Sequence, residues 1–432
     1  MPYVNIAETV DLIDLPVSTE VCSTVLIPLI YVAKTSEEAK KPPKTYSSLA
    51  AFTNDFKEND CKSIVVGSEN KLDPSYTLIT DLLSRTNTRN NIKVVVHPIR
   101  VDSPIDDVKK KLEDEIGTKN AYEHYAKNAN LFNIKYLTTG AWPSVWAVGS
   151  GSEKKEVNKI PGKMADVASK ITSAVALLNF EDGYEQFKAT VNALNPTNSS
   201  AVYLTGFWPN SKVTGQDTSI PGSFYYLHTH FSDLENYPDH FATAGKTRGR
   251  AEYIRNGTRI PFDPTYEVGE GLMHILQHDS GFDVESGLSP KCTVNPIMMW
   301  PDDGYLIYGN RTLLAPNSLN ESFLEYLNIR IMLCEIKKMI KRSAERITFE
   351  PNDEIAWINF KYNCNQLLDE LKGNRGLEWY RWEKQKTQLN GSGPVKQNQI
   401  VATLRLKPIV AVEAFDIGVL LTDQNAEISE EV

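Results

Sequence analysis

The chain has 432 residues, of which 41% are hydrophobic and 23% are charged, and its formal net charge at pH 7 is −9. The length predicts two or three domains of ordinary globular composition. The acidic balance argues against nucleic-acid binding as the main activity. No apolar run approaches the roughly 18 residues that a membrane-spanning helix needs, so we also expect no direct membrane insertion.

The first residues lack the basic start and apolar centre of a signal peptide. The five cysteines are odd in number and have no C-x-x-C spacing, which predicts reduced, mostly buried thiols and synthesis in a cytoplasm. Residues 3–14 have the apolar pattern of a strand, but Pro16 and a polar stretch follow. Two interpretations stay open: an arm that pairs away from its own domain, or a simple edge strand.

Between residues 23 and 101, continuous apolar runs alternate with amphipathic segments. Strands that are apolar throughout indicate a largely parallel sheet covered on both faces, so we expect an α/β fold. The predicted strands are 23–33, 63–67 and 91–99, and the predicted helices are 45–56, capped by Ser47 or Ser48, and 74–86.

The middle of the chain continues this mixture of helices and strands. The charges of residues 104–128 have both signs, which is typical of a solvated helical face. After it we predict a strand and turn over 131–142, helical structure over 163–194 broken near Asp182 and Gly183, and strands over 200–209 and 223–234.

The clearest periodicity lies between residues 295 and 347. A strand, a Pro301–Gly304 turn and a second strand precede a long helix, for which Ser318 and Glu321 have capping-box spacing. An apolar stripe predicts that one helix face is buried and that a basic face lies elsewhere. The stripe consists of Tyr326, Ile329, Leu333, Ile336, Ile340, Ala344 and Ile347.

The C-terminal part predicts a second helix and two strands. The helix covers residues 353–371, with Trp357, Phe360, Cys364, Leu367 and Leu371 on one face and Gly373 as its C-cap. Strands are expected at 399–406 and 412–421, separated by Lys407 and Pro408, before an acidic tail.

An ordered set of these pieces resembles the C-terminal half of contractile tail sheath proteins. It joins an N-P-I strand, a hairpin, G-x-R-T-L, a long helix with an early N-x-R, F-x-P-N and a tryptophan on the second helix. Two positions depart from that pattern, Tyr308 before the glycine and Thr243 in an upstream loop. The matching residues are Asn295, Pro296, Ile297, Gly309, Arg311, Thr312, Leu313, Asn328, Arg330, Phe349, Pro351, Asn352 and Trp357.

The resemblance implies a two-domain α/β fold with extended arms at both ends. The implied division is an N-terminal arm over 1–20, an α/β region over 21–194, a sheath core over 195–407, and an arm strand with an acidic tail over 408–432. In such sheaths each arm adds a strand to a neighbouring subunit. The implied inter-subunit residues are Tyr3, Val4, Asn5, Ile6, Ala7, Val412, Glu413, Ala414, Phe415, Ile417, Val419, Leu420 and Leu421.

Four basic residues lie off the apolar stripe of the long helix: Lys337, Lys338, Lys341 and Arg342. They form either a solvated face or, as the resemblance implies, a surface that contacts an inner tube. Either of the two long helices could face inward. The other partners implied by the resemblance are further copies of the chain and the baseplate and terminator proteins at the ends.

Histidines are the main candidates for chemistry. His228 and His230, two apart on a predicted strand and near Asp233, Asp239 and His240, have metal-ligand spacing. The alternative interpretation is an ordinary packed strand, which the lack of a third ligand at fixed spacing favours. His274 and His278 lack the glutamate of a zincin motif, and no nucleotide-binding motif is satisfied, so we expect no cofactor.

Together these observations predict a structural subunit of a contractile sheath rather than an enzyme. Such a subunit would be assembled in a bacterial host cytoplasm and reside in a phage tail or a related injection system. Two alternatives stay open: a metal or cysteine enzyme centred near His228 and His230, or another structural protein of a tail or baseplate.

Overall fold

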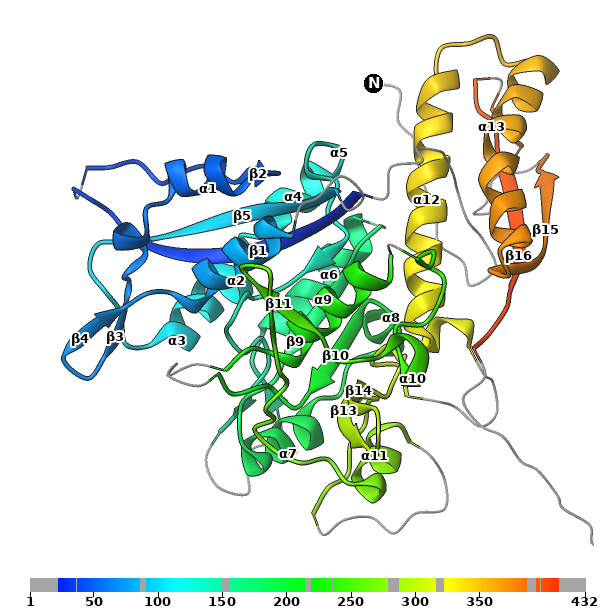
Figure 1. Ribbon diagram of the computed structural model, residues 1–432. Coiled ribbons are helices and arrows are strands. Elements are labelled where there is room, and N and C mark those ends of the chain that lie inside the picture. Colours follow the sequence, from blue (N-terminus) through cyan, green and yellow to red (C-terminus); the bar gives the residue numbers. More distant parts are fainter. Residues whose placement is uncertain are drawn as a thin grey trace, which may run out of the picture.

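A computed structural model describes residues 22–411, except residues 36, 86–90, 150–155, 172, 214–218, 235, 279–286, 316–321, 387–393 and 397. Figure 1 shows a body built on one twisted sheet and, beside it, a smaller lobe of two long helices and a two-stranded ribbon. In the described residues, no helix combines the length and the apolar character needed to cross a membrane.

The body is organised on an eight-stranded mixed sheet. The two longest strands, β1 and β5, pair in parallel over their whole length, while the edge strands β14 and β2 run antiparallel to their neighbours. In spatial order the strands are β14 (Gly304–Ile307), β13 (Asn295–Trp300), β10 (Leu204–Trp208), β9 (Val175–Asn179), β6 (Tyr136–Leu137), β1 (Cys22–Val32), β5 (Asn91–Val101) and β2 (Lys44–Tyr46).

Both faces of this sheet are buried, as the continuous apolar strands predict. Leu26 and Ile30 of β1 pack into one hydrophobic cluster, while Val25 and Ile27 pack into another on the opposite face. One cluster includes residues of α3 (Val108–Leu112), α4 (Glu123–Lys127), α6 (Ile160–Ile171), α7 (Tyr184–Ala193) and α11 (Glu270–Leu276). The other includes α1 (Leu49–Asp55), α2 (Pro74–Ser84) and α9 (Gly222–Asp233).

Short elements complete the body. Ser48 caps α1 by accepting a hydrogen bond from the Ala51 amide, which confirms one of the two predicted caps. The hairpins are β3 (Ile64–Val66) with β4 (Glu69–Lys71), β7 (Ala147–Val148) with β8 (Glu156–Val157), and β11 (Tyr253–Arg255) with β12 (Thr258–Ile260). The short helices are α5 (Ala129–Phe132), α8 (Asn198–Ala201) and α10 (Gly245–Arg248), with a π-helix at Glu113–Thr118 and a 3₁₀ turn at Glu58–Cys61.

Three predictions for the body are wrong in type or place. Residues 163–194 are not one broken helix, because they contain the buried strand β9 between α6 and α7. Residues 223–234 are not a strand but most of helix α9. The predicted strand at 63–67 exists, but it forms the β3–β4 hairpin outside the large sheet. All three segments are short or buried all round, so their periodicity does not separate helix from strand.

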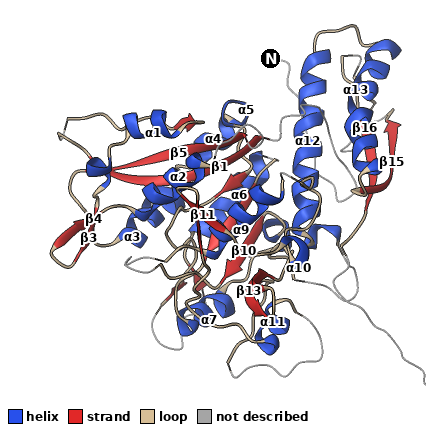
Figure 2. Ribbon diagram, viewed as in Figure 1, coloured by secondary structure: helices blue, strands red, loops and turns tan. Residues whose placement is uncertain are grey.

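The lobe contains α12 (Leu327–Ile347), α13 (Glu354–Gly373), β15 (Leu377–Lys384) and β16 (Ala402–Pro408), which Figure 2 shows as two helices beside a ribbon. The stripe predicted for the long helix is confirmed, because Ile329, Ile336 and Ile340 are buried in the lobe core. The capping box is formed by Ser322 and Glu325, at a 3₁₀ turn before α12. The predicted pair, Ser318 and Glu321, lies outside the described residues.

The large sheet crosses the domain boundary predicted between residues 194 and 195. β9, on one side of that boundary, pairs in parallel with β10 on the other side. The two predicted regions therefore share one sheet, and the lobe, which begins after residue 326, is the part with a separate hydrophobic core. The four cysteines whose side chains are described are free and buried, as predicted.

Candidate assembly site in the C-terminal lobe and its joint

Asn295 fixes the strand that leads toward the lobe. Its side-chain amide donates hydrogen bonds to Thr205 Oγ1 at 3.0 Å and to the Arg311 carbonyl at 2.8 Å, while its Oδ1 accepts from the Arg311 amide at 2.7 Å. A Cβ atom at Gly309 would lie 2.7 Å from Asn295 Oδ1, which explains the glycine. This buried asparagine thus ties β10, β13 and the segment after β14 into one unit.

The next residues of the motif connect this unit to the start of α12. The Thr312 amide donates to the Glu325 carbonyl at 2.8 Å. The Arg311 guanidinium lies 3.3 Å from Glu325 Oε2 and over the ring of Tyr326. Leu313 is buried and donates its amide to the Leu204 carbonyl at 2.8 Å, next to β10. The segment from Arg311 to Leu313 therefore holds the first turn of the lobe against the sheet.

The first turn of α12 completes the joint. Asn310 and Asn328 exchange hydrogen bonds: the Asn310 side-chain amide donates to Asn328 Oδ1 at 2.7 Å, and the Asn328 backbone amide donates to Asn310 Oδ1 at 3.2 Å. Arg330 is fully buried with its guanidinium 3.9 Å from the ring centre of Tyr203. Most of the predicted motif therefore forms the connection between body and lobe rather than an open surface.

A buried ion cluster adds a second connection to α12. Lys135, with 1% of its side chain exposed, lies 2.6 Å from Asp239 and 3.1 Å from Glu335 of α12. Burial alone would lower the pKa of Lys135, but the two carboxylates raise it above its usual value. Burial would raise the pKa of Asp239, yet Lys135 and His230 hold it well below its usual range. Lys135 and Asp239 are therefore both ionised at neutral pH.

The remaining motif residues lie in the lobe itself. Trp357 is buried in the lobe core, where its ring packs against those of Phe360 and Trp382. Pro351 and Asn352 are exposed in the turn between α12 and α13. The α13 helix begins where predicted, since Asp353 caps it by accepting from the Ala356 amide at 2.9 Å. Gly373 is the last residue of α13 and Asn374 is its C-cap, one residue later than predicted.

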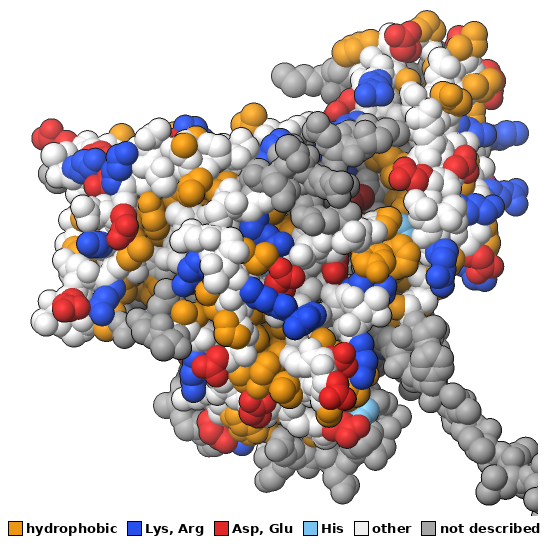
Figure 3. Space-filling model, viewed as in Figure 1, with side chains coloured by type: hydrophobic (Ala, Val, Ile, Leu, Met, Phe, Trp, Pro, Cys, Tyr) orange, Lys and Arg blue, Asp and Glu red, His pale blue; other side chains and the backbone are white. Residues whose placement is uncertain are grey.

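The ribbon of β15 and β16 offers unpaired strand edges. In the described part of the chain these two strands pair only with each other, in antiparallel register from Trp379 with Lys407 to Lys384 with Ala402. Figure 3 shows Lys and Arg side chains along the outer edge of the lobe. On the ribbon, Arg381 and Arg405 are exposed and both pair with Glu383. Charged side chains are a common protection of strand edges against unspecific pairing. The strand β15 was not predicted from the sequence, although its alternation of aromatic and charged residues is typical of a strand.

The open basic face predicted for the long helix is wrong for Lys337, which is 2% exposed. Its burial lowers the pKa of its ammonium to about 8. Lys338 is mostly buried and lies 3.7 Å from Glu335, and Lys341 donates a hydrogen bond to Asn130 of the body. The fourth candidate, Arg342, is half-buried. The reason is that α12 is covered on two sides, by the body and by the lobe core.

The metal site considered at His228 and His230 has no geometric basis. Both residues lie on α9, where positions two apart point in different directions. His228 Nδ1 lies 3.1 Å from Arg85, whereas His230 lies 3.1 Å from Asp239 and 2.9 Å from Thr243. Burial lowers the pKa of both imidazoles. Nor do three or more His, Cys, Asp or Glu side chains group as metal ligands anywhere in the described ranges.

The structure separates the second pair of histidines. His274 lies on α11, but His278 follows the end of that helix with a φ of 57°, so the pair does not share one helix. The predicted arm residues at positions 3–7 and 412–421 lie outside the described residues. Their pairing stays a prediction.

In sequence, the chain matches two curated phage proteins, while no model of a known protein family matches it. It is 25% identical over 137 residues, 32% of this chain and 20% of the relative, to the tail sheath protein of Vibrio phage KVP40. It is 26% identical over 243 residues, 56% of this chain and 35% of the relative, to the tail sheath protein of Enterobacteria phage T4. The chain thus spans only about a fifth to a third of the length of these relatives.

In structure, the fold matches over nearly the whole chain. A sheath complex of the extracellular contractile injection system PVC, in the contracted state, superposes with a TM-score of 0.59 at 15% identity and 98% coverage of both chains. A chain of the anti-feeding prophage baseplate gives a TM-score of 0.60 at 15% identity, covering 98% of this chain and 99% of that one. At such identities the likeness concerns the fold. In both sequence and fold, the chain resembles contractile tail sheath proteins.

Proposed function

We propose that the chain is a structural subunit of a contractile sheath. Copies polymerise into a helical cylinder around a tail tube and contract to drive the tube through a host envelope. The observation that carries this proposal is the β15–β16 ribbon, whose two strands have no further strand partner in the described residues. It sits on a fold that resembles sheath subunits.

The ribbon fits strand exchange by its chemistry. An added strand bonds to main-chain groups, so it needs little side-chain complementarity. Each such hydrogen bond contributes about 0.5–1.5 kcal/mol net, and several per arm connect two subunits firmly. Residues 3–7 and 412–421 have the apolar strand pattern that such a donor needs. The sheath core thus receives strands from neighbours while lending its own.

In this proposal, the free energy for contraction is stored in the extended assembly. The extended cylinder is a metastable packing that changes to a more compact one, while exchanged strands keep neighbouring subunits connected. The tube is the inner partner, and baseplate and terminator proteins close the two ends. Between the two long helices, α13 has the more open outer face, with Ile355, Ile358 and Tyr362 exposed. It is therefore the better candidate for the inward face than α12.

Electron microscopy of the purified chain tests this proposal. The full chain should form long hollow cylinders in negative stain, alone or with a tube protein. A chain lacking residues 1–15, and another lacking residues 412–432, should stay folded and monomeric. The second truncation spares β16, which ends at Pro408. Cylinders formed by either truncated chain would contradict arm exchange.

A further inference from the structure

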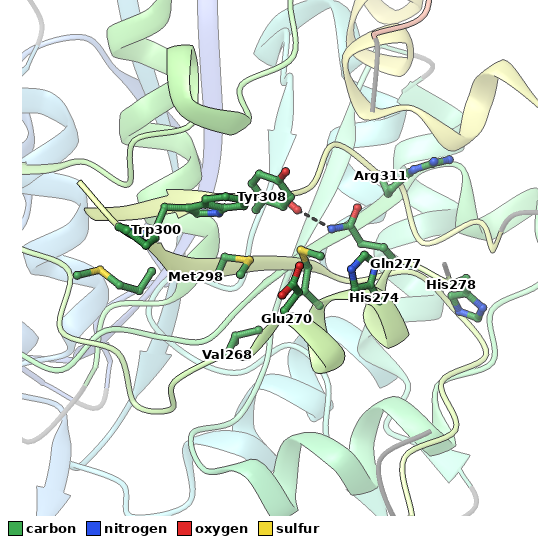
Figure 4. A pocket seen from close by; sticks show the side chains of 13 residues that line it. Val268, Glu270, His274, Gln277, His278, Met298, Trp300, Tyr308 and Arg311 are labelled. Atoms are coloured by element: carbon green, nitrogen blue, oxygen red, sulfur yellow. Dashed lines mark hydrogen bonds between the residues drawn. The ribbon is translucent and has the colours of Figure 1, made fainter. Parts of the chain in front are cut away.

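A pocket of about 600 Å³ opens between α11 and the β13–β14 hairpin. Figure 4 shows Trp300 and Tyr308 from the hairpin along one side, with the side chains of α11 below them. The two rings lie 4.9 Å apart between centroids. Met273 and Met298 supply apolar, polarisable surface, which favours contact with another aromatic ring. A cavity of about 150 Å³ accepts benzene, so this one has room for a large aromatic side chain.

One residue of the pocket lining carries a buried N–H group without a partner in the described part of the chain. Trp300 Nε1 is buried and finds no acceptor among the described residues. A buried indole N–H usually has a partner, so an acceptor on an incoming group would satisfy it. Gln277 is already engaged, since its amide donates to the Tyr308 carbonyl at 2.6 Å. The pocket therefore suits an aromatic side chain that packs against its aromatic and methionine lining.

Phe349 has the complementary properties. It lies in the turn between α12 and α13 and is 86% exposed, the largest exposed fraction among the large hydrophobic side chains of the described residues. Its φ of 79° is in the left-handed region, which is unfavourable for a bulky residue. Such strain at an exposed residue often marks a functional position.

The turn and the pocket lie at opposite ends of the molecule in Figure 1, the turn at the top of the lobe and α11 at the bottom of the body. Phe349 cannot reach the pocket of its own chain. From this arrangement we propose that Phe349 of one copy inserts into the pocket of a second copy, between Trp300, Met273 and Met298. A contact between two different surfaces repeats head to tail, which builds a ring or an open helical polymer.

The size of this contact defines its role. One buried aromatic side chain removes about 150–250 Å² from water, while a stable interface buries about 1,000 Å² or more. The contact alone therefore does not hold a dimer, and it acts where copies are already held close. This inference rests on the proposed sheath assembly, in which strand exchange supplies that proximity.

Disulfide trapping tests the contact. In a chain carrying Phe349→Cys and Met299→Cys, a mild oxidant should link neighbouring copies of the assembled protein, because Met299 lines the pocket and is 54% exposed. The matched control carries Tyr362→Cys and Met299→Cys, since Tyr362 is another exposed aromatic residue of the same lobe, on α13 and away from the turn. Ladders of linked copies should form with the first pair only. Equal linking by both pairs, or none by the first, overturns the proposal.

A second measurement avoids introduced thiols. Phe349→Ala should lower the apparent affinity between copies about tenfold or more, as removal of a central aromatic anchor commonly does, while Tyr362→Ala should not. Analytical ultracentrifugation over a concentration series gives both values. Cylinders without Phe349-dependent association would refute this contact and leave the sheath function standing. Linked copies without cylinders would refute the sheath function and leave the contact standing.

Discussion

The ammonium of Lys135 lies 2.6 Å from Asp239 Oδ2 at a point where three distant segments meet. Lys135 precedes β6, Asp239 follows α9, and Glu335 of α12 lies 3.1 Å from the same ammonium. Through Asp239 the cluster extends to His230, at 3.1 Å. A single buried cation thus holds the long helix of the lobe to the centre of the sheet.

Replacing this cation should destabilise the protein strongly. Lys135→Met leaves the mostly buried Asp239 carboxylate and the part-exposed Glu335 carboxylate without their cation. Breaking a buried ion pair typically costs about 3–5 kcal/mol. Urea unfolding measures the change in unfolding free energy. The control is Lys246→Met, which removes an exposed pair with Asp303 and should change the stability by less than about 1 kcal/mol. Equal effects of the two substitutions would contradict the assigned role of the cluster.

Lys337 should make the stability depend on pH above neutrality. Its folded pKa of about 8 is below its usual value of 10.5. Between these values the unfolded chain binds the proton and the folded chain does not, so the unfolding free energy rises with pH across that window. The difference between the two pKa values corresponds to about 3 kcal/mol of unfolding free energy.

Substituting Lys337 by Met should therefore raise the unfolding free energy at pH 7 and remove that rise between pH 8 and 10.5. Chemical denaturation of both proteins at a series of pH values gives the difference curve. Lys338→Met is the control, since Lys338 lies 3.7 Å from Glu335 and should give no gain. A lower stability at pH 7 with an unchanged pH dependence would count against the desolvation account.

Gly309 should tolerate no side chain. A Cβ atom there would lie 2.7 Å from Asn295 Oδ1 and 3.0 Å from Asn295 Cα, so Gly309→Ala must displace the residue that joins β10 and β13. Forcing an extra methyl group into a packed site costs about 1–3 kcal/mol. Gly373→Ala is the matched control, because nothing lies within 4 Å of its Cβ position. A thermal-shift series in which both variants melt like the parent would show that the joint can relax.

The cap of α13 should be measurable by itself. Asp353 Oδ1 accepts a hydrogen bond from the Ala356 amide at 2.9 Å, so Asp353→Ala should lower the unfolding free energy by about 0.5–2 kcal/mol. Asp353→Asn keeps the acceptor and should lose much less. Urea unfolding of the three proteins compares them. A loss with Asn as large as that with Ala would assign the effect to charge rather than to the cap.

The sequence by itself determined the elements whose residues carry their own signal. The stripe from Ile329 to Ile340 specifies a helix with one buried face, because its spacing fits 3.6 residues per turn. The hairpin between β13 and β14 follows from its turn residues. The N-P-I strand, the glycine and the early asparagine of the long helix also indicated the joint, although each of these pieces alone is a weak signal.

Only the tertiary structure decided the rest. The strand β9 and the helix α9 are buried on all sides. Their apolar patterns therefore do not show whether each segment is a helix or a strand. Lys337 is buried because α12 lies between the body and the lobe core, and a periodic pattern reports only that one face is apolar. Which strands are neighbours in the sheet, and which side chains meet across it, depends on long-range packing that no local stretch of residues encodes.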